Sequence, residues 1–185
     1  MDKQDKHTRF KCLIMPHLDS AYNLARWLVR NNDDAEEAVQ EAFLRAYRYF
    51  GSFRGEDGKA WLLTIVRHTC YTLRGQQLGA GHCEEFDEQT HRPELAAEGS
   101  GNCFCRDPVD IAIEHADREW VNRAIEELPV VFREVLVMRE LEELSYKEIA
   151  KIIDIPLGTV MSRLARGRQM LHEALVAHVK KGVHK

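Results

Sequence analysis

The sequence predicts an all-α protein with two small helical domains joined by a flexible acidic linker, the C-terminal domain containing a helix-turn-helix. Apolar residues recur at spacings of three and four over residues 10–74, and again from residue 109 almost to the end. The dipeptides typical of hairpin turns are absent between these apolar runs, so no β-strand is expected. The helical period is lost between the two stretches. We therefore divide the chain into residues 1–75, 76–108 and 109–185.

Length, charge and cysteine content limit the class of protein. The 185 residues suffice for two small domains. The net charge is −4 (26 basic minus 30 acidic residues), which argues against a uniformly basic coat for nucleic acid. No apolar run approaches the roughly 20 residues of a membrane helix, and the charged first residues do not lead into a secretory signal. The five cysteines form no CxxC pair and favour a reducing compartment, so we expect a cytoplasmic protein.

Two helices open the first domain. We expect the first over about residues 10–30, with Pro16 near its start or kinking it. Asp33 or Asp34 then caps the second. The apolar stripe of the first helix consists of Leu18, Tyr22, Ala25, Leu28 and Val29.

The second helix has two kinds of face. The apolar face carries Val39, Phe43, Ala46, Tyr47 and Phe50, which we expect in the core. The other faces present acidic and amide side chains with one apolar and one basic residue, which suits a surface that binds a partner protein. Those residues are Glu37, Gln40, Glu41, Leu44 and Arg45.

A third helix over residues 59–74 combines aromatic rings with positive charge outside its buried stripe. Rings stack on bases and cations attract phosphates, so the helix suits a platform for single-stranded nucleic acid. The alternative is that the rings lie at the edge of the core and the arginines are solvated. This helix taken alone favours that alternative. The residues concerned are Trp61, Arg67, His68, Tyr71 and Arg74.

Residues 76–108 contain seven acids and two bases without a hydrophobic face, a composition typical of a solvated linker. The same stretch holds thiol and imidazole groups that suit zinc or copper(I), which leaves open a metal- or redox-sensing regulator. The spacing matches no usual structural zinc site, and incidental solvated side chains explain it as well. These residues are His82, Cys83, His91, Cys103 and Cys105.

The second domain predicts a DNA-binding helix-turn-helix after helices over about residues 111–128 and 130–141. Ser145 and Glu148 form a capping box that begins the first helix of the motif, and Thr159 begins the second after a short break. Residues 157–185 carry six bases and one acid, a local charge of +5 that attracts phosphates. The basic and hydroxyl side chains available to DNA are Ser162, Arg163, Arg166 and Arg168.

Two groups of segments resemble a known family. Residues 34–47 (DAEEAVQEAFLRAY) and 61–69 (WLLTIVRHT) resemble the promoter-melting domain of bacterial RNA polymerase sigma factors. Leu128-Pro129 and residues 144–150 and 156–166 resemble the domain that recognises the −35 element. With only these two domains and a short linker, the chain is similar to the extracytoplasmic-function (ECF) group of the sigma-70 family.

The resemblance implies an alternative sigma factor that binds core RNA polymerase, and it assigns roles to residues. The row Glu37, Gln40, Glu41, Leu44 and Arg45 would dock on the β′ clamp coiled coil, and the β flap would be a second polymerase contact. Trp61, Arg67, His68, Tyr71 and Arg74 would hold the melted −10 strand with a base flipped out. His68 stands where many members carry Asn.

For the −35 element, the resemblance implies contacts from Ser162, Arg163 and Arg166. Ser145, Tyr146, Lys147 and Thr159 would lie nearer the phosphates. Met161 stands where many members carry a basic residue.

The resemblance further implies that the acidic linker threads toward the polymerase active site, and that an anti-sigma factor, often membrane-bound in this group, holds the protein inactive. A plain solubilising tether accounts for the linker equally well. The sequence contains no phosphate loop, nucleophile elbow or paired-histidine metal motif, so neither an enzyme nor a bound cofactor is expected. A dimeric repressor that uses the same helix-turn-helix is a further alternative, but it would not explain the first domain.

Overall fold

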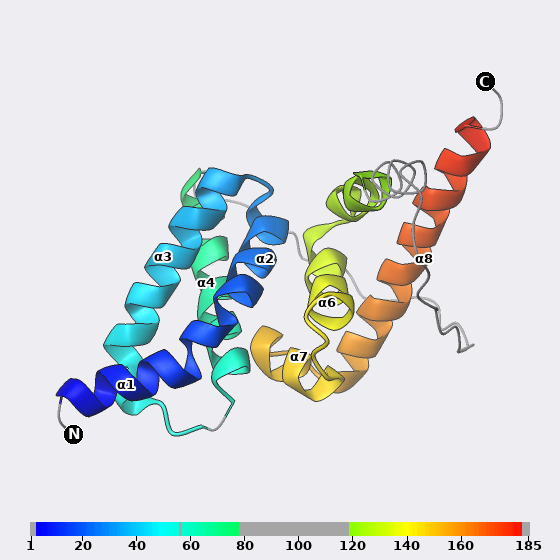
Figure 1. Ribbon diagram of the computed structural model, residues 1–185. Coiled ribbons are helices and arrows are strands. Elements are labelled where there is room, and N and C mark those ends of the chain that lie inside the picture. The colour runs from blue at the N-terminus through cyan, green and yellow to red at the C-terminus, as the bar shows by residue number, and fades with distance from the viewer. Residues whose placement is uncertain (1–2, 56, 78–118, 183–185) are drawn as a thin grey trace, which may run out of the picture.

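The protein is described by a computed structural model that covers residues 3–55, 57–77 and 119–182. All regular structure in these residues is helical, which confirms the all-α prediction, and the helices form two lobes (Figure 1). The predicted linker lies outside them. The N-terminal lobe contains α1 (Lys3–Leu13), η1 (Met15–His17), α2 (Leu18–Val29), α3 (Asn32–Tyr49), η2 (Phe50–Ser52) and α4 (Gly58–Gln77). The C-terminal lobe contains helical residues 119–127, α6 (Val130–Glu140), α7 (Tyr146–Ile153) and α8 (Leu157–Gly182).

Pro16 divides the first predicted helix into separate elements. We expected one helix over about residues 10–30, but α1 ends at Leu13, and Pro16 lies in the first turn of the 3₁₀-helix η1 before α2 begins. Proline has no backbone N–H, and its ring clashes with the carbonyl four residues earlier, so a continuous helix is interrupted here. The residue that caps α3 also differs from the expected Asp33 or Asp34. The cap is Asn31, whose side-chain oxygen accepts a hydrogen bond from the Asp33 N–H at 3.2 Å.

The core of the N-terminal lobe lies where α2, α3 and α4 pack together. Helix α3 contributes mostly small residues to it, among them Ala35, Ala38 and Ala42, and small side chains let neighbouring helices approach closely. Two residues that we expected in the core, Leu18 and Tyr47, are each 41% exposed. Both lie on the side of their helix that faces α1, which covers them only in part.

The helix-turn-helix of the C-terminal lobe has the predicted start and a slightly earlier second helix. The Ser145 hydroxyl accepts the Glu148 N–H at 3.3 Å and the Glu148 carboxylate accepts the Ser145 N–H at 2.6 Å, so the capping box is confirmed. Asp154 ends α7 with a left-handed φ of 61°. Helix α8 starts at Leu157 rather than Thr159. The buried side chains that join the two helices are Ile149, Ile153, Val160 and Leu164.

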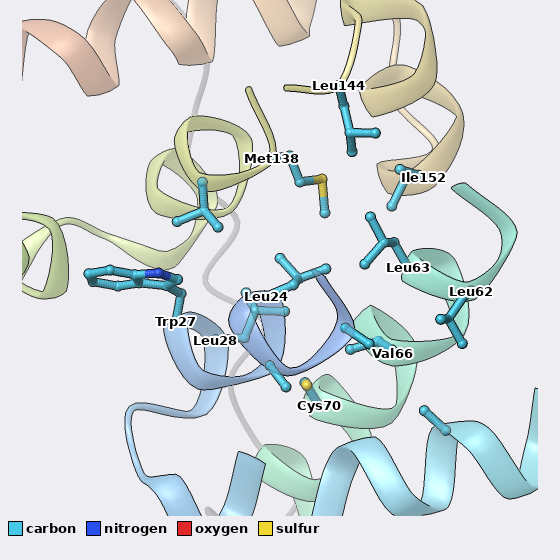
Figure 2. Close-up of a cluster of buried hydrophobic side chains, with 14 of the residues drawn as sticks. Leu24, Trp27, Leu28, Leu62, Leu63, Val66, Cys70, Met138, Leu144 and Ile152 are labelled. Atoms are coloured by element: carbon cyan, nitrogen blue, oxygen red, sulfur yellow. The ribbon is translucent and has the colours of Figure 1, made fainter. Parts of the chain in front are cut away.

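The two lobes share one hydrophobic core, which the sequence did not predict. Met138 of α6 is fully buried and points toward Leu24 of α2 and Leu63 of α4 (Figure 2). Leu144 and Ile152 extend this contact along α7, which packs against α4. The described chain is therefore closed, with α6 and α7 lying on α2 and α4.

Two further side chains differ from the expected pattern. Trp120 and Val121 lie in the helix that we expected over about residues 111–128, and they are 40% and 37% exposed although both are large and apolar. Within the described ranges, no helix is long and apolar enough to cross a membrane.

Candidate nucleic-acid interface

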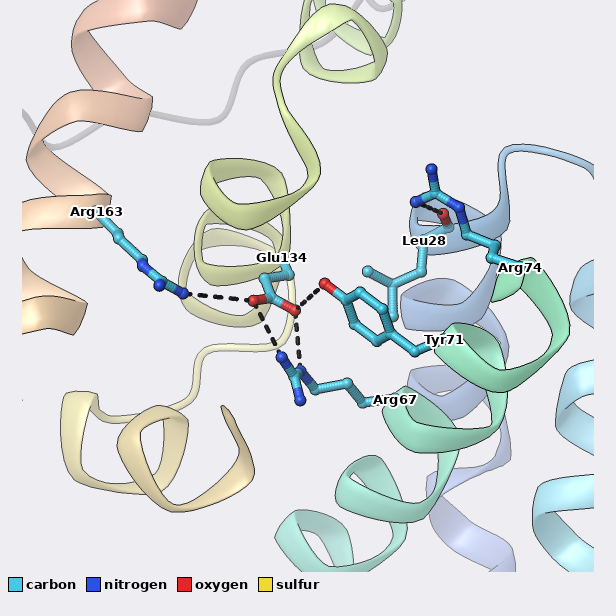
Figure 3. A network of polar contacts seen from close by, with 6 residues as sticks. All are labelled: Leu28, Arg67, Tyr71, Arg74, Glu134 and Arg163. Carbon is cyan, nitrogen blue, oxygen red and sulfur yellow. Dashed lines mark hydrogen bonds and ion pairs between the residues drawn. The ribbon is translucent and has the colours of Figure 1, made fainter. Parts of the chain in front are cut away.

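Two residues of α4 that we assigned to the −10 element meet an acid of the other lobe (Figure 3). The Arg67 guanidinium donates from Nε to Glu134 Oε2 at 2.9 Å and from Nη2 to Oε1 at 3.4 Å. The Tyr71 hydroxyl donates to the same Oε2 at 2.9 Å. These residues are four apart on a helix and therefore lie on one face, with the Arg67 guanidinium 4.7 Å from the Tyr71 ring centroid.

Glu134 also binds a residue that we assigned to the −35 element. Arg163 Nη1 of α8 lies 3.8 Å from Glu134 Oε1, and the Glu134 side chain is only 1% exposed. A buried carboxylate is stable only where donors or opposite charges replace its lost hydration. Here Arg67 and Tyr71 donate hydrogen bonds, and Arg163 adds a positive charge. Glu134 of α6 therefore contacts two residues that we expected at the −10 element and one that we expected at the −35 element.

Burial and the Glu134 charge set the protonation of the groups around it. Burial alone would lower the pKa of Arg67, but the hydrogen bond and negative charge of Glu134 outweigh it and raise that pKa. Burial raises the pKa of Tyr71, and the Glu134 charge raises it further. Arg67 therefore stays charged and Tyr71 stays a neutral donor near neutral pH.

The other −10 candidates lie apart from this cluster. Trp61 is half-buried against Phe53, with ring centroids 4.8 Å apart, which matches the alternative of an aromatic at the edge of the core. Arg74 Nη1 donates to the Leu28 carbonyl at 3.3 Å near the end of α4. His68 is exposed. The structure therefore brings together two of the five candidates on α4.

Helix α8 presents only part of the expected basic surface. Ser162, Arg166 and Arg168 are exposed, and Arg168 is paired with Glu140 at 2.6 Å, whereas Arg163 lies at Glu134 with its side chain 24% exposed. The first turn of the motif is more open. Ser145 and Lys147 are exposed, Tyr146 is half-buried with Arg139 5.2 Å from its ring, and Thr159 is half-buried.

The expected polymerase-binding row belongs to α3, a helix on the side of the N-terminal lobe that is remote from the C-terminal lobe (Figure 1). Glu37, Gln40 and Leu44 are exposed, Leu44 to 65%, whereas Glu41 and Arg45 are half-buried and pair at 2.6 Å. A groove of about 680 Å³ beside this row is mostly apolar. It is lined by His7, Phe10, Lys11, Met15, Leu18, Val39, Gln40, Phe43, Leu44 and Tyr47.

Sequence reasoning missed two components of these surfaces. Glu134 follows Arg133 in a helix and resembles any solvated acid, so no local signal marks it as buried. The α1 side of the groove was missed because we expected one helix over about residues 10–30, whereas α1 and α2 are separate elements on either side of Pro16.

The linker side chains proposed for metal or redox sensing, namely His82, Cys83, His91, Cys103 and Cys105, lie outside the described residues. Two cysteines within them differ in environment: Cys12 is exposed and Cys70 is buried. Burial raises the pKa of the Cys70 thiol to about 12.

We expect a thiol reagent at pH 8 to modify Cys12 rapidly and Cys70 only after unfolding. Burial blocks access to Cys70, and the raised pKa lowers its thiolate fraction roughly a thousandfold relative to a thiol at 9.0. The measurement is a colorimetric thiol titration of a variant with Cys83, Cys103 and Cys105 changed to Ser, with and without denaturant. Equal rates for the two thiols would contradict the burial.

Comparisons with known proteins match both lobes. The Sigma-70 region 2 profile matches residues 13–77, and the profile of Sigma-70, region 4 matches residues 118–171. The chain is 34% identical over 166 residues to the ECF RNA polymerase sigma-E factor of Escherichia coli K12, covering 88% of this chain and 84% of the relative. It is 30% identical over 175 residues to the RNA polymerase sigma-H factor of Pseudomonas aeruginosa, covering 90% and 86%.

Two solved structures are similar over both lobes. The sigma factor RpoE of Bartonella quintana, in complex with the anti-sigma factor NepR, has a TM-score of 0.65 and 26% identity, covering 90% of this chain and 96% of that chain. CnrH in complex with the cytosolic domain of CnrY has a TM-score of 0.63 at 21% identity, covering 92% and 90%, and shows a similar fold.

These matches define the class of protein. The chain belongs to the ECF RNA polymerase sigma factors, which are transcription initiation factors and not enzymes. The family implied by the sequence motifs is therefore confirmed.

Proposed function

We propose that the N-terminal lobe docks this sigma factor on core RNA polymerase through α3, with Leu44 at the centre of the contact. The observation that carries this assignment is the 65% exposure of Leu44 within a polar row and at the edge of an apolar groove. A large exposed apolar side chain in such surroundings is typical of a protein interface. Glu37, Gln40, Glu41 and Arg45 would surround it, and the partner segment would be the β′ clamp coiled coil.

We further propose that the three segments of the chain have different functions. Residues 1–75 would bind polymerase and melt the −10 element, residues 76–108 would link the two functions, and residues 109–185 would bind the −35 duplex and the β flap. The exposed Ser162 and Arg166 of α8, together with Ser145 and Lys147 of α7, support contact with duplex DNA. On α4, the combined rings and charges of Trp61, Arg67, His68, Tyr71 and Arg74 suit an unpaired strand.

An anti-sigma factor is the proposed regulator, acting on a cytoplasmic protein. The similar structure of RpoE from Bartonella quintana is of a sigma factor bound to the anti-sigma factor NepR, which supports this proposal. A regulator that held this chain in its closed form would keep Arg67 and Tyr71 on Glu134 and away from DNA.

The test is run-off transcription from genomic fragments with core polymerase from the source bacterium. We expect discrete new start sites only when the protein is added, and loss of at least 90% of that signal with Leu44→Asp, because a charge in the centre of an apolar contact is desolvated without a partner.

Tyr49→Asp is the matched control, because Tyr49 is also exposed on α3 but lies on another face. If no new transcripts appear and the protein alone binds duplex DNA, the result would favour the repressor alternative. Equal effects of the two substitutions would reject Leu44 as the contact.

A further inference from the structure

Helix α8 carries a row of apolar side chains that do not belong to the core. Met161 is 49% exposed, Leu157 is 39% exposed, and Ala165 is also exposed. Residues four apart lie one above another on a helix, so these three side chains form the apolar row. The core contacts of this part of α8 come instead from Val160 and Leu164, which are buried. The fold therefore gives no reason for the apolar row.

The polar side chains next to Met161 are engaged within the protein. The Ser162 hydroxyl donates to the Thr159 carbonyl at 3.0 Å, so its proton is used within the helix and its oxygen remains as an acceptor. Arg163 Nη1 lies 3.8 Å from Glu134, and the Arg163 side chain is 24% exposed. Among the described residues of α8, Met161 is the large apolar side chain with the highest exposure.

The start of α8 is open to the close approach of a partner. A Cβ placed at Gly158 would meet no atom within 4 Å. In a helix-turn-helix, the N-terminal residues of the second helix contact base edges in the major groove, which is about 12 Å wide and admits a helix. Met161 lies one turn after Leu157, the first residue of α8, and thus belongs to this N-terminal part.

The charge around the apolar row favours duplex DNA as its partner. Ser162 and Arg166 each follow a member of the row by one position and are exposed. Residues 157–185 carry six bases and one acid, which attract the phosphates of a duplex. The apolar group that base edges present in the major groove is the C5-methyl group of thymine. Methionine is unbranched and flexible, so its side chain adapts to the position of such a methyl group.

We infer that Met161 is a specificity-determining residue that recognises the C5-methyl group of a thymine in the −35 duplex. The inference rests on the proposed function of α7 and α8, and it adds the base and the chemical group. A basic side chain in this place would donate to guanine O6 and N7, but methionine has no N–H or O–H to donate. The base is therefore recognised through van der Waals contact.

Replacement of thymine by deoxyuridine tests this inference, because the two bases differ only in the methyl group. Duplexes are first selected from a pool with a random central segment by the full-length protein, alone and together with core polymerase. We expect the selected site to contain a thymine whose replacement by deoxyuridine weakens binding by the wild-type about fourfold. The same replacement should leave the affinity of Met161→Ala unchanged.

Val176→Ala is the matched control for Met161→Ala. Val176 is also apolar and 37% exposed on α8, but it lies about 22 Å further along the helix. This variant should retain the fourfold effect of the methyl group. Met161→Lys should lose the effect and should select guanine in place of the thymine. A merely structural role of Met161 would weaken binding to both duplexes equally and would not change the selected base.

Several results would overturn the inference. One is that no selected thymine is sensitive to the loss of its methyl group. Another is that the wild-type and Met161→Ala respond equally to deoxyuridine, and a third is that Met161→Lys still selects thymine. Equal responses combined with weaker binding of Met161→Ala to core polymerase would assign the apolar row to a protein contact instead.

These outcomes are distinct from failure of the proposed function. New start sites without an effect of the methyl group would reject the recognition of thymine and leave the sigma activity standing. An effect of the methyl group on duplexes bound by the protein alone, without new start sites, would retain the recognition of thymine and reject the polymerase role. A pool from which the protein selects no site, with or without polymerase, would overturn both.

Discussion

Glu134→Ala is expected to lower the free energy of unfolding by about 3 kcal/mol. The substitution removes the carboxylate that faces Arg67, Tyr71 and Arg163, and it leaves their donors in a largely buried site without an acceptor. A buried partner that loses its counter-charge is much more costly than an exposed one, because water cannot fully replace the lost interaction.

The matched control is Glu140→Ala on the same helix. Glu140 forms a pair of the same chemical type with Arg168 at 2.6 Å, but the two side chains are 43% and 47% exposed. An exposed pair contributes less than about 1 kcal/mol. Urea denaturation of the two variants measures the difference, and equal losses would contradict the burial of Glu134.

Arg133→Met is expected to have the opposite sign and to raise the free energy of unfolding by about 2 kcal/mol. Arg133 is completely buried, and its Nη1 donates to the Glu126 carbonyl at 2.8 Å. Among the described residues, its Nε and Nη2 are buried without a hydrogen-bond partner. Methionine fills a similar unbranched volume without those unpaired donors.

The pH dependence of this variant follows from the pKa of Arg133. Burial, followed by the charges of Arg30 and Arg74, lowers that pKa from 12.5 to about 10. Above pH 10 the folded chain releases a proton that the unfolded chain retains, so the wild-type gains stability as the pH rises. The advantage of Arg133→Met should therefore be full at pH 7 and smaller at pH 10.5.

Chemical denaturation at the two pH values checks this expectation, with Arg139→Met as the control. Arg139 lies on the same helix, is half-buried and donates to the Leu144 carbonyl at 3.0 Å, so its replacement should lower stability slightly at both pH values. A destabilised Arg133→Met would show that the guanidinium makes a favourable contact that outweighs its unpaired nitrogens.

Local features of the sequence predicted the local features of the fold. The Ser145–Glu148 capping box was predicted because its two hydrogen bonds depend on residues three apart, and the buried faces of α7 and α8 follow from the helical period. Pro16 was placed near the start of one helix or at a kink in it, but the sequence did not predict that the helix is divided into α1, η1 and α2. This division depends on how α1 packs across Phe43 and Phe50.

The contact between the lobes could not be predicted, because its interactions join residues far apart in the chain. Arg67 is 67 positions from Glu134, and Asn23 is 119 positions from Glu142. Neither acid differs in its local pattern from a solvated surface residue. The same limitation affected Arg163 and Arg168, whose charges were assigned correctly to α8 but whose partners on α6 belong to tertiary structure.

Glu134 lies in the same lobe as Arg163 but in the opposite lobe from Arg67 and Tyr71. Separation of the lobes therefore affects the three contacts differently. When the lobes separate, Arg67 and Tyr71 lose the carboxylate entirely, whereas Arg163 keeps it as a neighbour. Separation of the lobes would therefore release Arg67 and Tyr71, whereas Arg163 would stay restrained beside Glu134. In the −35 contact that we propose for Arg163, DNA would have to compete with Glu134 for the guanidinium, so weak sites would lose this contact first and the internal acid would sharpen promoter choice.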